Sequence, residues 1–309
     1  MLTEWWFYVG VIVALFIVFG ALIWWIGAKS QQPRIVPNDK DPQIDTGWKS
    51  LTFQSSGFKI EGWLLQPAVV SGEVNGLTPI VVIAHGWGSN RTRVLRYAKP
   101  LYEAGYAVLM YDARSHGESD KIKGPSALMF RDDVIAAVAE ARKLPGIDPH
   151  RVAILGHSMG GFGTLLALDE GLRVNAVVTD SMPVHFDTML KAELDSKKLP
   201  MFPLAYLIPK IWMIRSKISK EQFESANIPV VLKKNAGAVE EGKQPVLMLH
   251  SYGDTFIPAD DLSKLVRELP QGTIDTVFVN TEGHSSSEQD PGFWKTILPF
   301  LEQAFARRV

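Results

Sequence analysis

At residues 152–163 the chain reads Val-Ala-Ile-Leu-Gly-His-Ser-Met-Gly-Gly-Phe-Gly. An apolar, strand-like run ends there in a Gly-x-Ser-x-Gly turn, and a helical pattern follows directly. Ser158 in such a turn lies at the carboxyl end of a strand and the amino end of a helix, with its hydroxyl exposed. Gly156 and Gly160 fit this interpretation, because a Cβ at either position would collide where strand and helix cross. The stretch predicts a nucleophile elbow, and a structural Gly-rich turn is the alternative.

The composition is that of a globular protein with a large core. Of the 309 residues, 46% are hydrophobic and 21% are charged, and the formal net charge is −1. This balance, with no basic stripe and no zinc-finger spacing, argues against a nucleic-acid partner. The chain has no cysteine, which excludes a thiol nucleophile, a disulfide and a Cys-bound metal. We therefore expect no nucleic acid and no metal at its site.

The first 28 residues have the pattern of a transmembrane anchor. No charged residue occurs between Trp5 and Ala28, and tryptophan pairs lie at both ends of the run. At about 1.5 Å per residue such a helix spans the roughly 30 Å hydrocarbon core of a bilayer. A cleaved signal peptide is the alternative, but residues 1–4 lack Lys and Arg, and no small-residue cleavage site follows. Lys29, Arg34 and Lys40 come after the span, so the positive-inside rule places the following domain of this single-pass protein in the cytoplasm.

Residues 29–47 are polar with three prolines and are expected to form a flexible linker with a reach of about 25 Å. From residue 48 to 309 short apolar runs alternate with helical patterns, which predicts an α/β domain with a mostly parallel, eight-stranded sheet and helices on both faces. The first two strands, joined around Ser56-Gly57, are expected to form an antiparallel hairpin at one edge. The predicted strands are 49–54, 58–65, 79–85, 106–112, 152–157, 175–180, 245–250 and 274–279, and the predicted helices are 91–103, 128–143, 159–169, 259–268 and 292–306.

Residues 183–244 interrupt this alternation. They lie between the sixth and seventh predicted strands and include an apolar run from Met201 to Ile214. An unstructured loop of that length is uncommon in a compact domain, so we expect a mainly helical cap that encloses substrate over the carboxyl edge of the sheet. The alternative is a packing excursion with a buried helix.

A serine nucleophile needs a base and a group that orients the base. Of the seven histidines, only His284 follows the last predicted strand in a glycine-containing loop that can reach back over the sheet edge. Asp254 follows the seventh strand, and the chain order Ser158, Asp254, His284 is the one this class of fold uses. Asp254 alone also fits a turn or the N-cap of the helix that begins at Ala259. Asp180, at the end of the sixth strand, is the next candidate for the acid.

Acyl transfer also needs N–H donors for the oxyanion. The backbone N–H of Met159, directly after the nucleophile, is one candidate. The second is the N–H of Trp87, in the His-Gly-Trp-Gly segment that follows the third predicted strand. Its glycines, Gly86 and Gly88, allow that backbone to approach a substrate. A simple strand-terminating turn is the alternative for this segment.

With these motifs in place, residues 48–309 resemble the α/β-hydrolase superfamily, and within it the branch of monoacylglycerol lipases and serine-aminopeptidase-like hydrolases. The segments that carry the resemblance are His85 to Gly88, Asp112 to Ser119, Gly156 to Gly160, Gly253-Asp254 and Gly283-His284. The resemblance implies a serine hydrolase that uses no cofactor. The chain departs from the branch at Ser115, where glycine is usual, and at Ser251, where the strand before the acid usually ends in His-Gly.

These features predict a membrane-anchored serine hydrolase that cleaves carboxylic esters of an apolar or lipid-like substrate through an acyl-enzyme. Ser158 is the expected nucleophile, His284 the base and Asp254 its orienting acid. A serine peptidase or amidase on the same fold is the main alternative, and a non-catalytic membrane scaffold is the other. The expected partners are a small-molecule or lipid-like acyl substrate and the lipid bilayer.

Overall fold

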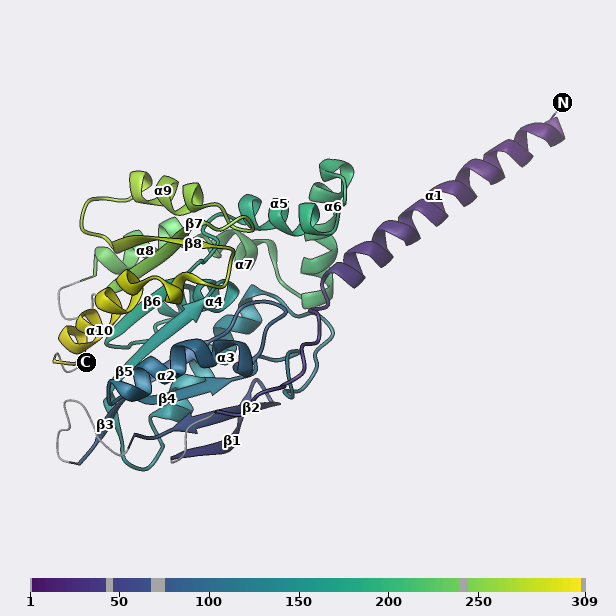
Figure 1. The fold of residues 1–309 in the computed structure, drawn as a ribbon. Coiled ribbons are helices and arrows are strands. Elements are labelled where there is room, and N and C mark those ends of the chain that lie inside the picture. Colours follow the sequence, from purple (N-terminus) through teal and green to yellow (C-terminus); the bar gives the residue numbers. More distant parts are fainter. Residues whose placement is uncertain (1, 43–46, 68–75, 239–243, 307–309) are drawn as a thin grey trace.

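The computed structural model describes residues 2–42, 47–67, 76–238 and 244–306. Its centre is one eight-stranded sheet with the strand order β1-β2-β4-β3-β5-β6-β7-β8, which confirms the predicted mostly parallel sheet (Figure 1). β1 and β2 pair antiparallel at one edge, as predicted, and the strands from β4 to β8 run parallel. The strands are β1 Trp48–Ser55, β2 Phe58–Leu65, β3 Thr78–Ala84, β4 Ala107–Tyr111, β5 Ile147–His157, β6 Ala176–Asp180, β7 Val246–Gly253 and β8 Asp275–Glu282.

Helices cover both faces of this sheet. α3 (Ala127–Ala141), α4 (Met159–Asp169) and α9 (Ala259–Glu268) contribute buried side chains to the core on one face. α2 (Leu95–Glu103), which follows the short 3-10 helix η1 (Arg91–Val94), and α10 (Pro291–Phe305), which follows η3 (Ser287–Gln289), pack on the other. The central strands are buried on both sides, which explains why their sequences are continuous apolar runs.

The expected cap is helical where the structure describes it. α5 (Phe186–Ser196), α6 (Met201–Ser216) and α7 (Lys220–Ser225) follow β6 (Figure 1). The next helix, α8 (Ile228–Ala236), differs from the expectation, because its Ile228, Val231 and Leu232 are buried in the same core cluster as α4. The cap proper therefore ends before α8, and residues 239–243 of the predicted insertion lie outside the described residues.

α1 (Leu2–Ser30) projects away from the domain beside α6 (Figure 1). Its segment Trp5–Ser30 is long and apolar enough to cross a membrane, with a mean hydropathy of 2.7 in its most apolar window, and most of that window is exposed. A signal sequence near the N-terminus shares these two properties. The helix extends two residues into the predicted linker.

Residues 31–42 have no regular secondary structure, yet they pack on the domain, which differs from the flexible coil expected there. Val36 is buried, and the Asn90 side chain donates hydrogen bonds to the carbonyl oxygens of Val36 and Pro37 at 2.9 and 3.0 Å. Asn38 donates to Asp112 Oδ2 at 3.0 Å. Residues 43–46 of the predicted linker lie outside the described residues.

Candidate active site

Ser158 lies in a sharp turn between β5 and α4. Its backbone has φ 51° and ψ −120°, a conformation that L-residues rarely adopt. Its N–H donates to the carbonyl oxygen of Asp180 at 2.9 Å, which ties the turn to the neighbouring strand β6. Such strain persists only where the surroundings hold it, and it is common at functional sites. The local geometry is therefore that of the predicted nucleophile elbow.

The glycines beside Ser158 are required by close backbone contacts. A Cβ on Gly156 would lie 2.5 Å from the Cα of Gly161, on the helix that follows. A Cβ on Gly160 would collide with the carbonyl oxygen of Ala84 at the end of β3. Glycine at both positions lets β5, β3 and α4 meet directly below the serine.

The structure brings Ser158, His284 and Asp254 together from three separate loops. His284, after β8, has its Nε2 2.9 Å from Ser158 Oγ and its Nδ1 2.7 Å from Asp254 Oδ2. With the Nδ1–H donating to the carboxylate, Nε2 is free to accept the serine proton. The three residues predicted from the sequence thus form one continuous hydrogen-bonded chain.

The Asp254 carboxylate is held from several sides after β7. Its Oδ1 accepts the backbone N–H groups of Phe256 and Ile257 at 2.8 and 2.9 Å. Burial acts to raise the pKa of Asp254, but the hydrogen bond and charge of His284 and these two N–H groups together lower it below its ordinary value. The carboxylate is therefore ionised and fixed in position. Asp180, the next candidate for the acid, instead accepts hydrogen bonds from Tyr97 and Ser181.

The two predicted oxyanion donors lie beside the serine. Met159 is the first residue of α4, where an N–H has no acceptor within its own helix. The loop that carries Trp87 packs against the elbow, because a Cβ on Gly86 would lie 2.9 Å from Ser158 Cβ. Among the hydrogen bonds of the described residues, neither the Met159 nor the Trp87 N–H has a protein acceptor. Neither N–H group is thus taken up by the protein among the described residues, as the predicted role requires.

Sequence reasoning assigned no role to His157, the residue before the nucleophile. Its Nε2 lies 2.9 Å from the carbonyl oxygen of His284, and its ring is buried. Burial, with the nearby charges of Arg96 and His284, lowers the pKa of His157 well below its ordinary value. The ring is neutral, and its Nε2–H donates to the loop that carries the base. The only sequence signal was its position inside the turn motif.

Two other buried histidines support the loops around the site. His85 accepts the Ala113 N–H at its Nε2 (2.9 Å) and bonds to the Gly86 oxygen through Nδ1 (2.7 Å). Burial lowers its pKa to about 4. Burial, with His85 nearby, lowers the pKa of His116 to about 3. Both rings are therefore neutral near pH 7, and they pack against each other below Trp87.

The two departures from the resembled branch have local structural explanations. Ser115 has φ 65°, in the left-handed region where glycine is favoured, and its hydroxyl accepts the Ile122 N–H at 2.9 Å. Ser251 is buried, and its hydroxyl donates to the Thr281 carbonyl oxygen and so joins β7 to β8 below Asp254. Neither side chain lines the active-site cavity.

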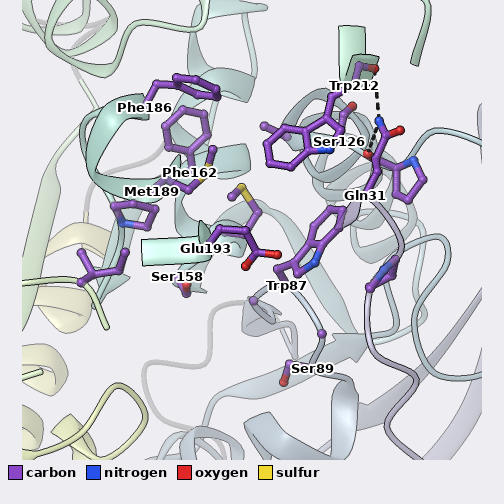
Figure 2. A pocket seen from close by; sticks show the side chains of 18 of the residues that line it. Gln31, Trp87, Ser89, Ser126, Ser158, Phe162, Phe186, Met189, Glu193 and Trp212 are labelled. Carbon is purple, nitrogen blue, oxygen red and sulfur yellow. Dashed lines mark hydrogen bonds between the residues drawn. The ribbon is translucent and has the colours of Figure 1, made fainter. Parts of the chain in front are cut away.

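A cavity of about 2170 Å³ lies above Ser158 and His284. Figure 2 shows Phe162, Met189 and Phe186 on one side of it and Trp87, Trp212 and Gln31 on the other. Most of its lining side chains near the serine are apolar or aromatic, and the cap provides many of them. Glu193 also faces the cavity, but its carboxylate is paired with Lys197. Among the described residues, no group of three or more His, Cys, Asp or Glu is placed to hold a metal ion.

This chain has the α/β-hydrolase fold. Its strand order, the strained turn at Ser158 and the Ser-His-Asp arrangement are the features that define this class. Within that class, the family model described as serine aminopeptidase, S33, matches residues 77–225. The structure of the esterase Pf2001 from Pyrococcus furiosus superposes with a TM-score of 0.65 at 18% identity, covering 88% of this chain and 98% of that one. At this identity the likeness concerns the fold alone.

Curated relatives match in sequence as well. The quorum-quenching protein AidA from Acinetobacter baumannii is 36% identical over 132 residues, which is 41% of this chain and 41% of that protein. The uncharacterised protein YqkD from Bacillus subtilis is 24% identical over 305 residues, covering 94% of this chain and 93% of YqkD. The chain spans half or less of the length of several curated relatives that it matches.

Proposed function

We propose that this protein is a membrane-anchored serine hydrolase that cleaves carboxylic esters with apolar or lipid-like acyl groups. The observation that carries the proposal is the continuous contact from Ser158 Oγ through the His284 ring to Asp254 Oδ2, with distances of 2.9 and 2.7 Å. A serine in a strained elbow with a base and an oriented acid is the arrangement that activates a hydroxyl for attack on a carbonyl. The family match over residues 77–225 supports a hydrolase.

In the proposed mechanism Ser158 Oγ attacks the ester carbonyl carbon while His284 Nε2 accepts the hydroxyl proton. Asp254 stabilises the imidazolium, and the N–H groups of Trp87 and Met159 stabilise the tetrahedral oxyanion. Collapse breaks the bond to the alcohol oxygen, which takes the proton from His284 and leaves. Water then attacks the acyl-enzyme with His284 as base, which releases the carboxylic acid and regenerates the serine.

Two features support an apolar substrate in the membrane, and a third indicates the side on which the domain lies. The cavity above Ser158 is lined largely by aromatic and aliphatic side chains of the cap and domain. α1 has the length and hydropathy of a membrane span, and the cap and domain pack directly at its end. Lys29, Arg34 and Lys40 after the span favour a cytoplasmic domain by the positive-inside rule.

A serine peptidase or amidase is the second candidate, because the matched family model is described as serine aminopeptidase. Recognition of a substrate amine would need an unpaired carboxylate near the serine. Glu193 lines the cavity but is already paired with Lys197, whereas Asp187, which also lines it, has no ion pair among the described residues. An assay with both substrate classes therefore decides between the ester and the aminoacyl amide.

The full chain in detergent micelles would be assayed with p-nitrophenyl esters from acetate to decanoate and with aminoacyl p-nitroanilides. We expect kcat/KM to rise from acetyl to medium chains, because each buried methylene contributes about 0.8 kcal/mol. A steady fall beyond acetyl, or faster cleavage of the anilides, would overturn the assignment in favour of the peptidase. Ser158→Ala should abolish both turnover and labelling by a fluorophosphonate probe. If Ser158→Ala hydrolyses the esters at the wild-type rate, Ser158 is not the nucleophile.

A further inference from the structure

The end of α1 is built into the cap. The Trp212 indole N–H lies 3.1 Å from both the Gly27 carbonyl oxygen and Ser30 Oγ. Ile23 of α1 is buried in one cluster with Ile208 and Ile211 of α6. A Cβ on Gly27 would lie 2.8 Å from Ile211 Cδ1, so the two helices approach as closely as glycine allows. The last two turns of α1 and the helix α6 therefore move as one unit.

Gln31 extends this connection to the domain below. Its side chain is buried, with Nε2 2.7 Å from Ser216 Oγ and 3.1 Å from the Trp212 carbonyl oxygen. Its Oε1 accepts Arg215 Nε at 2.8 Å, and Arg215 donates onward to the Lys123 carbonyl oxygen. Figure 2 shows Gln31 on the Trp212 side of the cavity. The position of α1 relative to the active site is thus determined by buried hydrogen bonds.

The cavity that Ser158 and His284 line is also lined by Trp25 and Ile26 of α1. The Trp25 side chain is 62% exposed, so it lies at the mouth of the cavity. Trp24, one position earlier, is 45% exposed and does not line the cavity. Above the mouth the surface of α1 is apolar and exposed, as at Phe19 and Leu22. Trp25 and Ile26 therefore belong both to the cavity lining and to the helix whose apolar surface a bilayer would cover, with Lys29 and Gln32 lining the cavity beside them.

We infer that the last turns of α1 form one wall of an acyl-chain site, through which the chain of a membrane lipid ester reaches Ser158 directly from the bilayer. This inference rests on the proposed function and specifies its substrate and route of entry. The carbonyl lies at Ser158, and the alkyl chain follows Met189 and Trp212 towards Trp25. Because Trp25, Ile26 and Trp212 offer apolar surface to such a chain, its burial favours long over short acyl groups.

The test uses the full chain in phosphatidylcholine nanodiscs, with Trp25→Ala compared with Trp24→Ala. Both changes remove an interfacial tryptophan from the same turn, but only Trp25 lines the cavity. The readout is the kcat/KM for p-nitrophenyl palmitate divided by that for the acetate, measured for each variant. We expect this ratio to fall about tenfold in Trp25→Ala, since about two methylene groups lose their cover, and to stay at the wild-type value in Trp24→Ala. Trp25→Phe should recover part of the loss.

The same palmitate-to-acetate ratio in the wild type and in both alanine variants would overturn the inference. An equal fall of this ratio in the two alanine variants would also overturn it, because it would indicate a general effect of interfacial tryptophans. These outcomes are separate from failure of the proposed function. That failure appears as acetate hydrolysis that survives Ser158→Ala. Turnover that depends on Ser158 but shows an unchanged palmitate-to-acetate ratio would therefore reject the acyl-chain wall and leave the proposed hydrolase activity unaffected.

Discussion

The Nε2–H of His157 donates to the backbone carbonyl of His284 at 2.9 Å, so the residue before Ser158 holds the loop that carries His284. The two rings lie 5.1 Å apart. Because burial keeps His157 neutral, its ring has a single N–H, and the contact with a carbonyl oxygen assigns that proton to Nε2. The relative position of Ser158 and His284 thus depends on the hydrogen bond from the side chain of His157 to the backbone carbonyl of His284.

His157→Phe removes this donor and should lower kcat about fivefold with little change in KM, since a net hydrogen bond contributes about 1 kcal/mol. His157→Gln keeps an N–H donor and should recover most of the loss. Steady-state kinetics with a short ester measures both values. The midpoint of the acidic limb of kcat/KM should also move in His157→Phe and return in His157→Gln. Wild-type kcat in His157→Phe would contradict the positioning role.

Asp254→Asn should reduce kcat by up to about 10⁴ while the domain stays folded, because the amide stabilises the wrong imidazole tautomer. The Asn side chain can still accept the N–H groups of Phe256 and Ile257 through its oxygen, so the loop should keep its shape. Circular dichroism and single-turnover kinetics would separate the two effects. Asp180→Asn is an informative comparison, and a greater loss of kcat there than in Asp254→Asn would assign the acid to Asp180.

Gly160→Ala should destabilise the domain by about 1–3 kcal/mol or more, because its Cβ would collide with the Ala84 carbonyl oxygen, and backbone atoms yield less than side chains. Gly237→Ala is the matched control. A Cβ there meets its nearest atom, the Lys233 carbonyl oxygen, at 3.4 Å, which is an ordinary contact. Urea unfolding of both variants measures the difference. Equal midpoints would show that the elbow tolerates a side chain at residue 160.

The buried histidines predict a loss of stability in mild acid. The folded-state pKa values of His85 and His116 are about 4 and about 3, below the ordinary 6.5, so the unfolded chain binds more protons below pH 6.5. Their contribution is complete above pH 6.5 and decreases as pH falls towards 4, at up to about 1.4 kcal/mol per pH unit for each ring. Urea unfolding between pH 7 and 5, above the range where most carboxylates titrate, measures this slope.

His116→Gln should make that slope shallower, because one of the buried rings can no longer take up a proton on unfolding. His150→Gln is the control, since the His150 side chain is exposed in the folded protein. A slope that is the same in the wild type and in His116→Gln would mean that His116 is already protonated in the folded domain.

Much of this fold could be predicted because its strands are buried on both faces. Val152 to Leu155 and Val246 to Leu249 read as continuous apolar runs for that reason, and a parallel sheet brings their carboxyl ends to one edge. That edge is where Ser158 and Asp254 lie, so chain order and motif were enough to name both. Their roles remain proposals, while their proximity is a property of the sheet.

The contacts of the linker could not be predicted in this way. Gln31 reads as an ordinary polar residue beside Gln32, yet its side chain is buried among groups more than ninety residues away. Polar, proline-containing sequence is typical of flexible segments, and no local sequence feature distinguishes a residue whose side chain forms buried hydrogen bonds. The bond from His157 to His284 was missed for the same reason, because it joins loops 127 residues apart in sequence.

The buried hydrogen bonds of Gln31 and Trp212 leave no hinge between α1 and the domain. With α1 in a bilayer, any tilt of the helix becomes an equal tilt of the whole enzyme. The segment from Trp5 to Trp25 has 21 residues and is about 32 Å long, close to the roughly 30 Å of hydrocarbon, and a helix in a bilayer thinner than its own length responds by tilting. If the protein is anchored in a membrane as proposed, membrane thickness therefore sets the angle at which the cavity meets the lipid surface. In a thinner bilayer α1 and the attached domain would tilt further. The lipid composition would then change the orientation of the active site without any lipid bound there.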